Sequence, residues 1–380
     1  MTMSDSNDAR LSRREILGGL VSLAALPNVA LSQTEPAATF VVGCWARRPN
    51  RRPLTLLTGS SRTDRWTFGA AHEVITNAFF GYVHPQSQKI YLALNSDRTI
   101  VRASVSGEGK LVEEARWPSG GGEPSFIDGD RTGQYLAVAN FDASVESTVA
   151  VFRVGEALEL LAARSTTGHG PLDRQDRPHF HGAKFSPDNK FVYGCDMGGD
   201  QVIAFPFDAA TGKVGEQILA YKTAPGSGPR HILFHGNGRY AYVLNSLNST
   251  LGTFRLNPDG KLSLVDMRST LPDPGFKGYN HPGHIQSDAT GKYLYISNRG
   301  HDTLGVFAIG AEGQLKHLQW IASGGEWPWH FVLSSATQML VANWQSDAIT
   351  PFEIHQDGTL APRGKSLSIK GPIYILKAPA

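Results

Sequence analysis

The amino-acid sequence predicts an all-β protein, a seven-bladed β-propeller with four antiparallel strands in each blade. Three observations favour this fold class: an apolar strand pattern recurs six times, a glycine turn follows it at a nearly constant distance, and further strand patterns remain at both ends of the chain. The 380 residues suffice for a large core. With 41 glycines and 22 prolines, the composition favours short strands and turns over long helices.

The first residues are typical of an export signal. Paired Arg13 and Arg14 precede an apolar run from Ile16 to Leu26, and small residues follow at Ala30 and Ser32. The run is too short to span a bilayer. An amphipathic surface helix is the alternative, which the absence of a polar face disfavours. We expect a signal over residues 1–32, a linker over 33–38 and the propeller over 39–380.

The order Ser-Arg-Arg-x-Ile-Leu resembles the twin-arginine signal, whose export machinery carries folded proteins. The resemblance implies a periplasmic protein that begins near Gln33 and is not inserted in the membrane once the signal is removed. The remaining composition predicts a small-molecule partner and argues against nucleic acid, because the formal net charge is only +2. Cys44 and Cys195 are expected to be buried free thiols, and a single bridge between them is the alternative.

The six apolar strands each end in Asn or Asp. They are KIYLALN to Asn95, QYLAVAN to Asn140, KFVYGCD to Asp196, RYAYVLN to Asn245, KYLYISN to Asn298 and QMLVAN to Asn343. Five of the units also carry a glycine turn, at Gly109, Gly212, Gly260, Gly313 and Gly358. The last four glycines fall 15 or 16 residues after their Asn or Asp, which is the length of a loop, a strand and a tight turn.

Each unit therefore predicts a blade of four strands, A to D, with strand B ending at the Asn or Asp. Six blades are visible in this way. The seventh would combine TFVVGC from Thr39 and PLTLLT from Pro53 with LSIKGPIYILKA from Leu367, so that both ends of the chain close the ring. A two-domain β-sandwich is the structural alternative, but sandwiches lack this fixed offset.

The predicted architecture brings histidine and arginine side chains to one mouth of the central channel. That mouth is formed by the starts of the A strands and the loops between strands B and C. Arg230 and Arg299 belong there, together with eight histidines: His169, His179, His181, His231, His281, His284, His301 and His330.

His179 and His181 are the first candidates for chemistry. Being two residues apart on a strand, they are expected to point the same way, into the channel. A zinc site would need a third ligand, and none is obvious nearby, so no metal is expected. A structural role in a wet channel is the alternative to general acid–base work, for which a neutral imidazole is suited.

Arg230 and Arg299 are candidates for binding an anion or an oxyanion. Their structural alternatives are bracing of the next blade and a pair with Asp302. Trp327 and Trp329 could form an apolar or sugar-stacking wall, or could pack between blades.

Three stretches resemble the lactonase family of seven-bladed propellers, which includes 6-phosphogluconolactonases and carboxymuconate lactonizing enzymes. They are RPHFHGAKFSPDNKFVYGCDMGGDQV, GPRHILFHGNGRYAYVLNSLNST and GKYLYISNRGHDTLGVF, and the likeness covers roughly residues 39–378. The resemblance implies lactone chemistry without metal or other cofactor. It also implies active-site roles for His181, with His179 beside it, and for Arg230 and Arg299.

The chain departs from the family pattern at two positions. Ser246 stands where the family carries Glu, and Trp329 stands where relatives often carry Arg. Glu326 is expected to replace the carboxylate in part. His231, Glu326, Trp329, His330 and Ser246 complete the expected substrate-binding set.

The sequence thus predicts a lactonase that hydrolyses a sugar lactone or related cyclic ester in carbohydrate metabolism. His181 would deprotonate water, while Arg230 and Arg299 would stabilise the oxyanion. The alternatives are a muconate-type lactonizing cycloisomerase and a non-enzymatic periplasmic propeller that binds a ligand or a protein.

Overall fold

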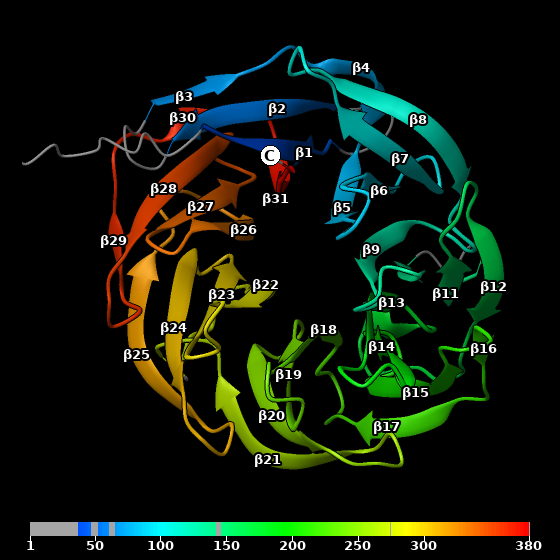
Figure 1. Ribbon diagram of the computed structural model, residues 1–380. Coiled ribbons are helices and arrows are strands. Elements are labelled where there is room, and N and C mark those ends of the chain that lie inside the picture. Colours follow the sequence, from blue (N-terminus) through cyan, green and yellow to red (C-terminus); the bar gives the residue numbers. More distant parts are fainter. Residues whose placement is uncertain (1–36, 47–51, 61–64, 142–145, 274, 380) are drawn as a thin grey trace, which may run out of the picture. The chain divides into compact units, whose positions relative to one another are not determined.

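Residues 37–46, 52–60, 65–141, 146–273 and 275–379 are described by a computed structural model. These residues belong to the compact unit Pro36–Ala380 and form seven antiparallel sheets around a common centre (Figure 1). This confirms the predicted all-β, seven-bladed propeller. The predicted export signal and linker lie almost wholly outside the described residues. Within them, no helix is long and apolar enough to cross a membrane.

Blades 1 to 3 follow one another along the chain, each ordered from the innermost strand outward. Blade 1 contains β5 (Ala78–Val83), β6 (Ile90–Leu94), β7 (Thr99–Val105) and β8 (Leu111–Pro118). Blade 2 contains β9 (Pro124–Gly129), β10 (Tyr135–Asn140), β11 (Thr148–Arg153) and β12 (Glu159–Arg164). After the short 3-10 helix η1 (Asp173–Gln175), blade 3 contains β13 (Phe180–Phe185), β14 (Phe191–Asp196), β15 (Gln201–Asp208), β16 (Lys213–Val214) and β17 (Ile218–Lys222).

Blades 4 to 6 repeat the same order. Blade 4 contains β18 (Pro229–Phe234), β19 (Tyr240–Asn245), β20 (Thr250–Leu256) and β21 (Leu262–Ser269). Blade 5 contains β22 (His281–Ser287), β23 (Tyr293–Arg299), β24 (Thr303–Ile309) and β25 (Leu315–Ala322). Blade 6 contains β26 (Pro328–Ser335), β27 (Gln338–Asn343), β28 (Ala348–Ile354), β29 (Leu360–Pro362) and β30 (Leu367–Ser368).

Blade 7 joins the two ends of the chain, as predicted. Its innermost strand is β31 (Pro372–Lys377), which pairs with β1 (Ala38–Cys44); β2 (Pro53–Ser60), β3 (Arg65–Phe68) and β4 (His72–Thr76) lie further out (Figure 1). The Tyr374 hydroxyl donates a 2.7 Å hydrogen bond to the Gly81 carbonyl of blade 1. Ring closure therefore depends on strands from opposite ends of the sequence.

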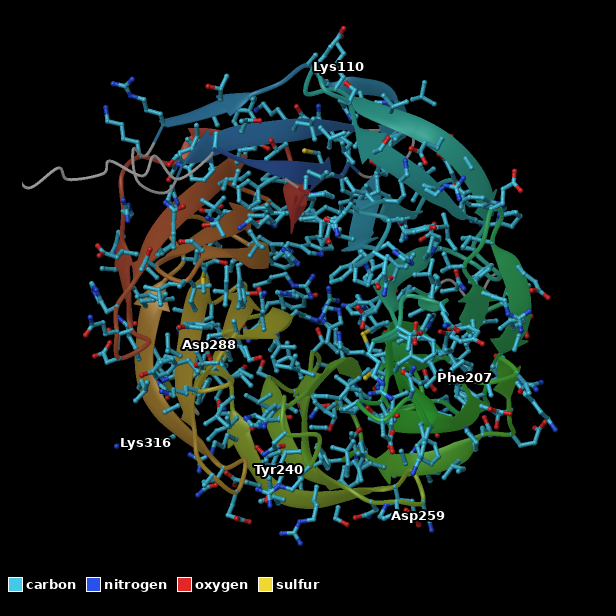
Figure 2. The ribbon with its side chains drawn as sticks, in the orientation of Figure 1. Lys110, Phe207, Tyr240, Asp259, Asp288 and Lys316 are labelled. Atoms are coloured by element: carbon cyan, nitrogen blue, oxygen red, sulfur yellow. The ribbon has the colours of Figure 1, made fainter. Side chains whose placement is uncertain are left out.

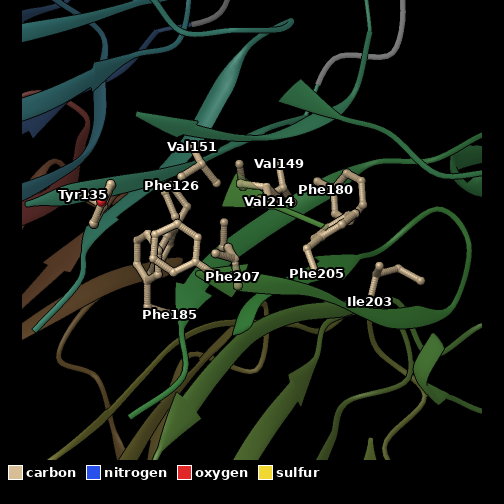
Figure 3. Packing of buried hydrophobic residues seen from close by; sticks show 14 residues of the cluster. Phe126, Tyr135, Val149, Val151, Phe180, Phe185, Ile203, Phe205, Phe207 and Val214 are labelled. Carbon is tan, nitrogen blue, oxygen red and sulfur yellow. The ribbon is translucent and has the colours of Figure 1, made fainter. Parts of the chain in front are cut away.

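The hydrophobic core is divided among the seven blade interfaces. Each of seven clusters of buried residues combines side chains of two neighbouring blades. In Figure 3, Phe126 and Val151 of blade 2 pack with Phe180, Phe185 and Phe205 of blade 3. The second strand of each blade is covered on both faces and reads as a continuous apolar run, whereas charged side chains such as Lys110 and Lys316 lie at the outer rim (Figure 2).

The recurring Asn and glycine residues have distinct structural roles. Asn140 and Asn343 each donate from Nδ2 to a Thr hydroxyl of the next strand, over 3.0 Å. Each also donates to the carbonyl of the serine that directly follows the outermost strand of the preceding blade, Ser119 or Ser323. Gly313 has a φ of +75°, and a Cβ there would lie 2.5 Å from the Tyr240 ring of blade 4. The regular spacing therefore reflects one set of contacts repeated around the ring.

Aromatic rings close the centre of the channel. Phe80 of blade 1 contacts rings from five other blades, and we call this group the central plug: Phe80, Phe126, His231, His284, His330 and Tyr374. Ring centroids lie 4.2 Å apart for Phe80 and Phe126, and 3.9 Å apart for His284 and His330. Burial lowers the pKa of all three imidazoles, that of His284 to about 3, so they are neutral near pH 7.

Removal of residues 372–380 should prevent formation of a cooperative ring, because β1 and the inner face of blade 7 lose their partner. We expect loss of the sharp thermal transition and aggregation at the exposed edge of β1. Tyr374→Phe, which loses only its hydrogen bond to Gly81, should cost about 1 kcal/mol of unfolding free energy. A cooperative transition in the truncated chain would contradict the proposed closure.

The plug should make stability fall as the pH decreases below about 6.5. The unfolded chain binds protons at its histidines there, whereas the folded imidazoles stay neutral until much lower pH. Each plug histidine should then remove about 1.4 kcal/mol of unfolding free energy per pH unit. Urea denaturation between pH 7.5 and 5 measures this slope, and His284→Phe should reduce it. A flat profile in the unchanged protein would refute the neutral plug.

Candidate active site

An extra residue in the innermost strand of each blade creates the mouth of the channel. Every innermost strand shifts register near its start, so that one more residue is present than on the paired second strand. Bulges of this kind re-aim a side chain. Five of the bulged residues line a single cavity, which we call the cup: Phe79, Ser125, His181, Arg230 and Trp329.

The residues at the end of the second strand of each blade form another part of the cup lining. One residue from each of the seven blades lines the cup there: Trp45, Asn95, Phe141, Met197, Ser246, Arg299 and Trp344. The segments that lead into the innermost strands add Glu123, Arg174, Tyr279 and Trp327, and β22 adds its first residue, His281. The enclosed volume is about 370 Å³, enough for a molecule of sugar-lactone size.

His181 and Arg230 are in direct contact at the floor of the cup. The Arg230 Nη1 donates to His181 Nε2, while Arg230 Nε donates to the Gly283 carbonyl over 2.8 Å. Because the guanidinium can only donate, the imidazole presents its lone pair at Nε2 and carries its proton at Nδ1. Burial, with Arg230 and Arg299 nearby, holds the pKa of His181 well below its usual value, so that it is neutral.

Arg299 is fixed by carbonyls and an aromatic ring. Its Nε donates to the His281 carbonyl over 2.9 Å, and its guanidinium carbon lies 4.8 Å from the centre of the Trp329 ring. Burial lowers its pKa to about 9 and lowers that of Arg230 as well. No carboxylate in the described part of the chain forms an ion pair with either guanidinium, so an anion entering the cup would meet two buried cations.

The two sides of the cup differ in chemistry. Blades 3 to 5 contribute polar and cationic groups, including His181, Arg230 and Arg299. Blades 6, 7 and 1 contribute an aromatic wall whose ring centroids lie between 5.3 and 6.3 Å apart: Trp45, Phe79, Trp327, Trp329 and Trp344. A ligand with a charged or polarised group and a flat apolar face would match both sides.

The structure brings five of the nine predicted site residues into the cup. His181, Arg230, Arg299, Ser246 and Trp329 line it, and Trp327 belongs to the same wall. The Ser246 hydroxyl lies 3.4 Å from His281 Nδ1 and donates to the Pro282 carbonyl over 3.3 Å. The Glu of the family pattern would be charged at this position, whereas the Ser246 hydroxyl is not.

His179 and Glu326 do not line the cup. The bulge at His181 interrupts the strand alternation, so the expectation that both imidazoles converge is wrong; His179 instead binds the Phe141 carbonyl over 3.0 Å and Asp176 over 3.1 Å. Glu326 is exposed, and the left-handed backbone at Trp327, with a φ of +62°, separates it from the innermost strand. Its predicted role as the replacement carboxylate therefore lacks support from the geometry.

His231 and His330 lie in the central plug and not in the cup. Each is one residue beyond a bulged residue, so it faces the deeper channel and lines a second cavity of about 280 Å³ further along the same strands. Of the eight histidines expected at one mouth, only His181 and His281 line the cup. Burial and the nearby arginines lower the pKa of His281 to about 3.

Several cup residues escaped sequence reasoning. Trp45 directly follows β1, and three others, Phe141, Met197 and Trp344, directly follow the Asn or Asp that ends their strand. The position after each repeated Asn or Asp therefore indicates a residue that lines the cup. Glu123 is the one carboxylate among the described residues of the cup. No distinctive motif marks it in the sequence.

Among the described residues, no group of His, Cys, Asp and Glu side chains is arranged to hold a metal ion. Cys44 and Cys195 are free and buried in the core, far apart in the ring on blades 7 and 3. Burial raises the pKa of Cys44 to about 12, so its thiol is a packing group and not a nucleophile.

Comparison with known proteins gives a consistent family assignment. Residues 42–377 match the family described as lactonase, 7-bladed beta-propeller. The chain is 28% identical to 6-phosphogluconolactonase of Bacillus subtilis over 75% of this chain and 86% of that protein, and 32% identical to an uncharacterized protein of Staphylococcus saprophyticus over 72% and 80%. The solved structure of a periplasmic gluconolactonase from Pseudomonas aeruginosa has a TM-score of 0.82 and 23% identity, covering 90% of this chain and 99% of that one. The chain therefore belongs to the lactonase family of seven-bladed β-propellers.

Proposed function

We propose that this protein hydrolyses a sugar lactone or a related cyclic ester in the cup. The observation that supports this most directly is the contact between a neutral, buried His181 and Arg230, with Arg299 lining the same 370 Å³ cavity. The names of the relatives agree, since they include a 6-phosphogluconolactonase and a gluconolactonase. A general base and cationic oxyanion partners are the groups that ester hydrolysis requires.

The proposed first step begins when the lactone carbonyl enters the cup. Its oxygen accepts hydrogen bonds from Arg230 and Arg299, which draws the Arg230 Nη1 away from His181 and frees the Nε2 lone pair. His181 then removes a proton from water as the water oxygen bonds to the carbonyl carbon. The negative charge moves to the carbonyl oxygen, where two cations stabilise it in a site shielded from solvent.

The second step breaks the ring. The tetrahedral intermediate collapses, the bond between the carbonyl carbon and the ring oxygen breaks, and the imidazolium of His181 returns its proton to the leaving alkoxide. The product is a hydroxy acid, and His181 is again neutral. The low basicity of His181 is offset in the intermediate because its positive charge lies beside the oxyanion.

The proposed reaction uses no metal or other cofactor. His179, the nearest further imidazole in the sequence, has both ring nitrogens engaged, at the Phe141 carbonyl and Asp176. His181 likewise has its Nε2 in contact with Arg230, a cation that a metal ion would have to displace. These contacts favour acid–base chemistry at His181 over metal ligation.

His181→Ala should lower kcat for acid release from aldonolactones by about 10² to 10⁴-fold with little change in binding, because only the proton transfer is lost. Arg299→Gln should lower kcat by about 10² to 10³-fold through loss of oxyanion stabilisation. His317→Ala on the outer strand β25 is the matched control and should retain activity. The assay follows acid production from sugar lactones with and without phosphate.

A non-enzymatic binding role is the second candidate. It is supported by Ser246 of blade 4, which lines the cup with an uncharged hydroxyl where the family pattern has a carboxylate. Calorimetric binding of lactones without acid release, across the whole panel and in the unchanged protein, would favour it over hydrolysis. Lactonizing activity on a muconate would instead indicate the cycloisomerase alternative.

We also propose that the protein is exported to the periplasm through its N-terminal signal, residues 1–32. The paired Arg13 and Arg14 before an apolar run support a twin-arginine route. Fusion of these residues to a reporter that is active only after export should give signal, and replacement of both arginines by lysine should abolish it. Export that persists in the lysine variant would exclude this route.

A further inference from the structure

A second pocket opens directly beside the cup. Its volume is about 640 Å³, and it lies between η1, which precedes blade 3, the residues that follow β19 of blade 4 and the segment that leads to β22. Three residues line both cavities: Arg174, Tyr279 and His281. We call this second cavity the outer pocket.

The boundary between the two cavities is a narrow group of side chains. Arg174 Nη1 donates to the Tyr279 hydroxyl over 3.3 Å, and the Tyr279 ring lies 4.2 Å from that of His281 and 5.7 Å from that of Trp327. Tyr279 is 59% exposed, so it stands at the mouth and is not part of the core. A ligand in the cup could therefore extend past Tyr279 without unfolding any buried element.

The polar groups of the outer pocket are mostly engaged with one another. Asn280 donates to Ser249 over 2.9 Å, Asn248 donates to Ser227 over 2.9 Å, and the Ser269 hydroxyl donates to the Leu271 carbonyl over 3.2 Å. Asp173 and Arg174 lie at the exposed rim. Few hydrogen-bonding groups of the interior thus remain available to an occupant.

Apolar side chains form the remaining surface of the outer pocket. They are Leu172, Leu247, Leu271 and Phe276, and Leu172 is 44% exposed despite its apolar character. An apolar surface left open beside a catalytic cavity is stabilised when a ligand covers it. The continuity with the cup indicates that this ligand is part of the same substrate.

We propose that the substrate is a lactone with an extended apolar substituent, whose ring occupies the cup while the substituent passes Tyr279 into the outer pocket. This inference rests on the proposed lactone hydrolysis and specifies its substrate class. The outer pocket acts on affinity, whereas His181 and the arginines act on the chemical step.

The test uses γ-lactones with alkyl chains of increasing length, from γ-butyrolactone through γ-hexanolactone and γ-octanolactone to γ-decanolactone. We expect KM to fall about three- to fourfold per added methylene until the pocket is filled, because each methylene leaves water. Leu271→Asn should raise KM for γ-decanolactone about tenfold and leave γ-butyrolactone unchanged. Leu219→Asn, at an exposed leucine of β17 outside the pocket, is the matched control and should change neither.

A KM independent of chain length, or equal effects of Leu271→Asn and Leu219→Asn, would overturn the outer-pocket proposal while leaving lactone hydrolysis intact. Absence of acid release from every lactone would instead contradict the proposed function. In that case the dissociation constants of the same series, measured by calorimetry, still decide whether the outer pocket binds apolar chains: affinity that rises with chain length supports it, and affinity that does not rules it out.

Discussion

The additional residue in the innermost strand of every blade is the constraint on which the site depends. In a regular strand, side chains alternate between the two faces of the blade, and only one set could point toward the mouth. The bulge breaks this alternation at the same height in all seven blades. Residues that are distant in sequence, such as Phe79, His181 and Trp329, therefore meet in one cavity of about 370 Å³.

The cup holds its two cations at an energetic cost that the fold only partly offsets. Arg230 and Arg299 are buried, and their pKa values are lowered because the charged form has lost most of its water. Carbonyls of Gly283 and His281 and the ring of Trp329 compensate in part, but no described carboxylate does so. Such an arrangement is stabilised by an anionic ligand and by negative charge that develops during a reaction. Electrostatics thus links the architecture of the mouth to the proposed chemistry.

The fold was predictable because its signals are local and repeated. The Asn that ends a second strand is visible in the sequence, since Asn140 and Asn343 make the same hydrogen bonds in different blades. The repeat pattern predicts that His181, Arg230 and Arg299 lie at one mouth of the channel, and their resemblance to family motifs adds the expectation of active-site roles. His231 and His330 were misplaced because a bulge cannot be recognised from apolar alternation, and a shift of one residue reverses the direction of a side chain. Glu326 was misplaced for a similar reason, the left-handed backbone at Trp327.

The central plug leaves the cup open on one side of the ring only. Because Phe80 contacts rings from five other blades, the channel is closed beneath His181, and the second cavity of about 280 Å³ is separated from the cup by packed rings. In the proposed reaction, substrate and product then pass through the same mouth. That mouth is bordered by Tyr279 and Arg174, so the residues that shape the outer pocket also lie on the path of exchange. In the proposed reaction, substrate selection and product release therefore involve the same part of the mouth, whereas the ester bond is broken deeper in the cup, between His181 and the two arginines.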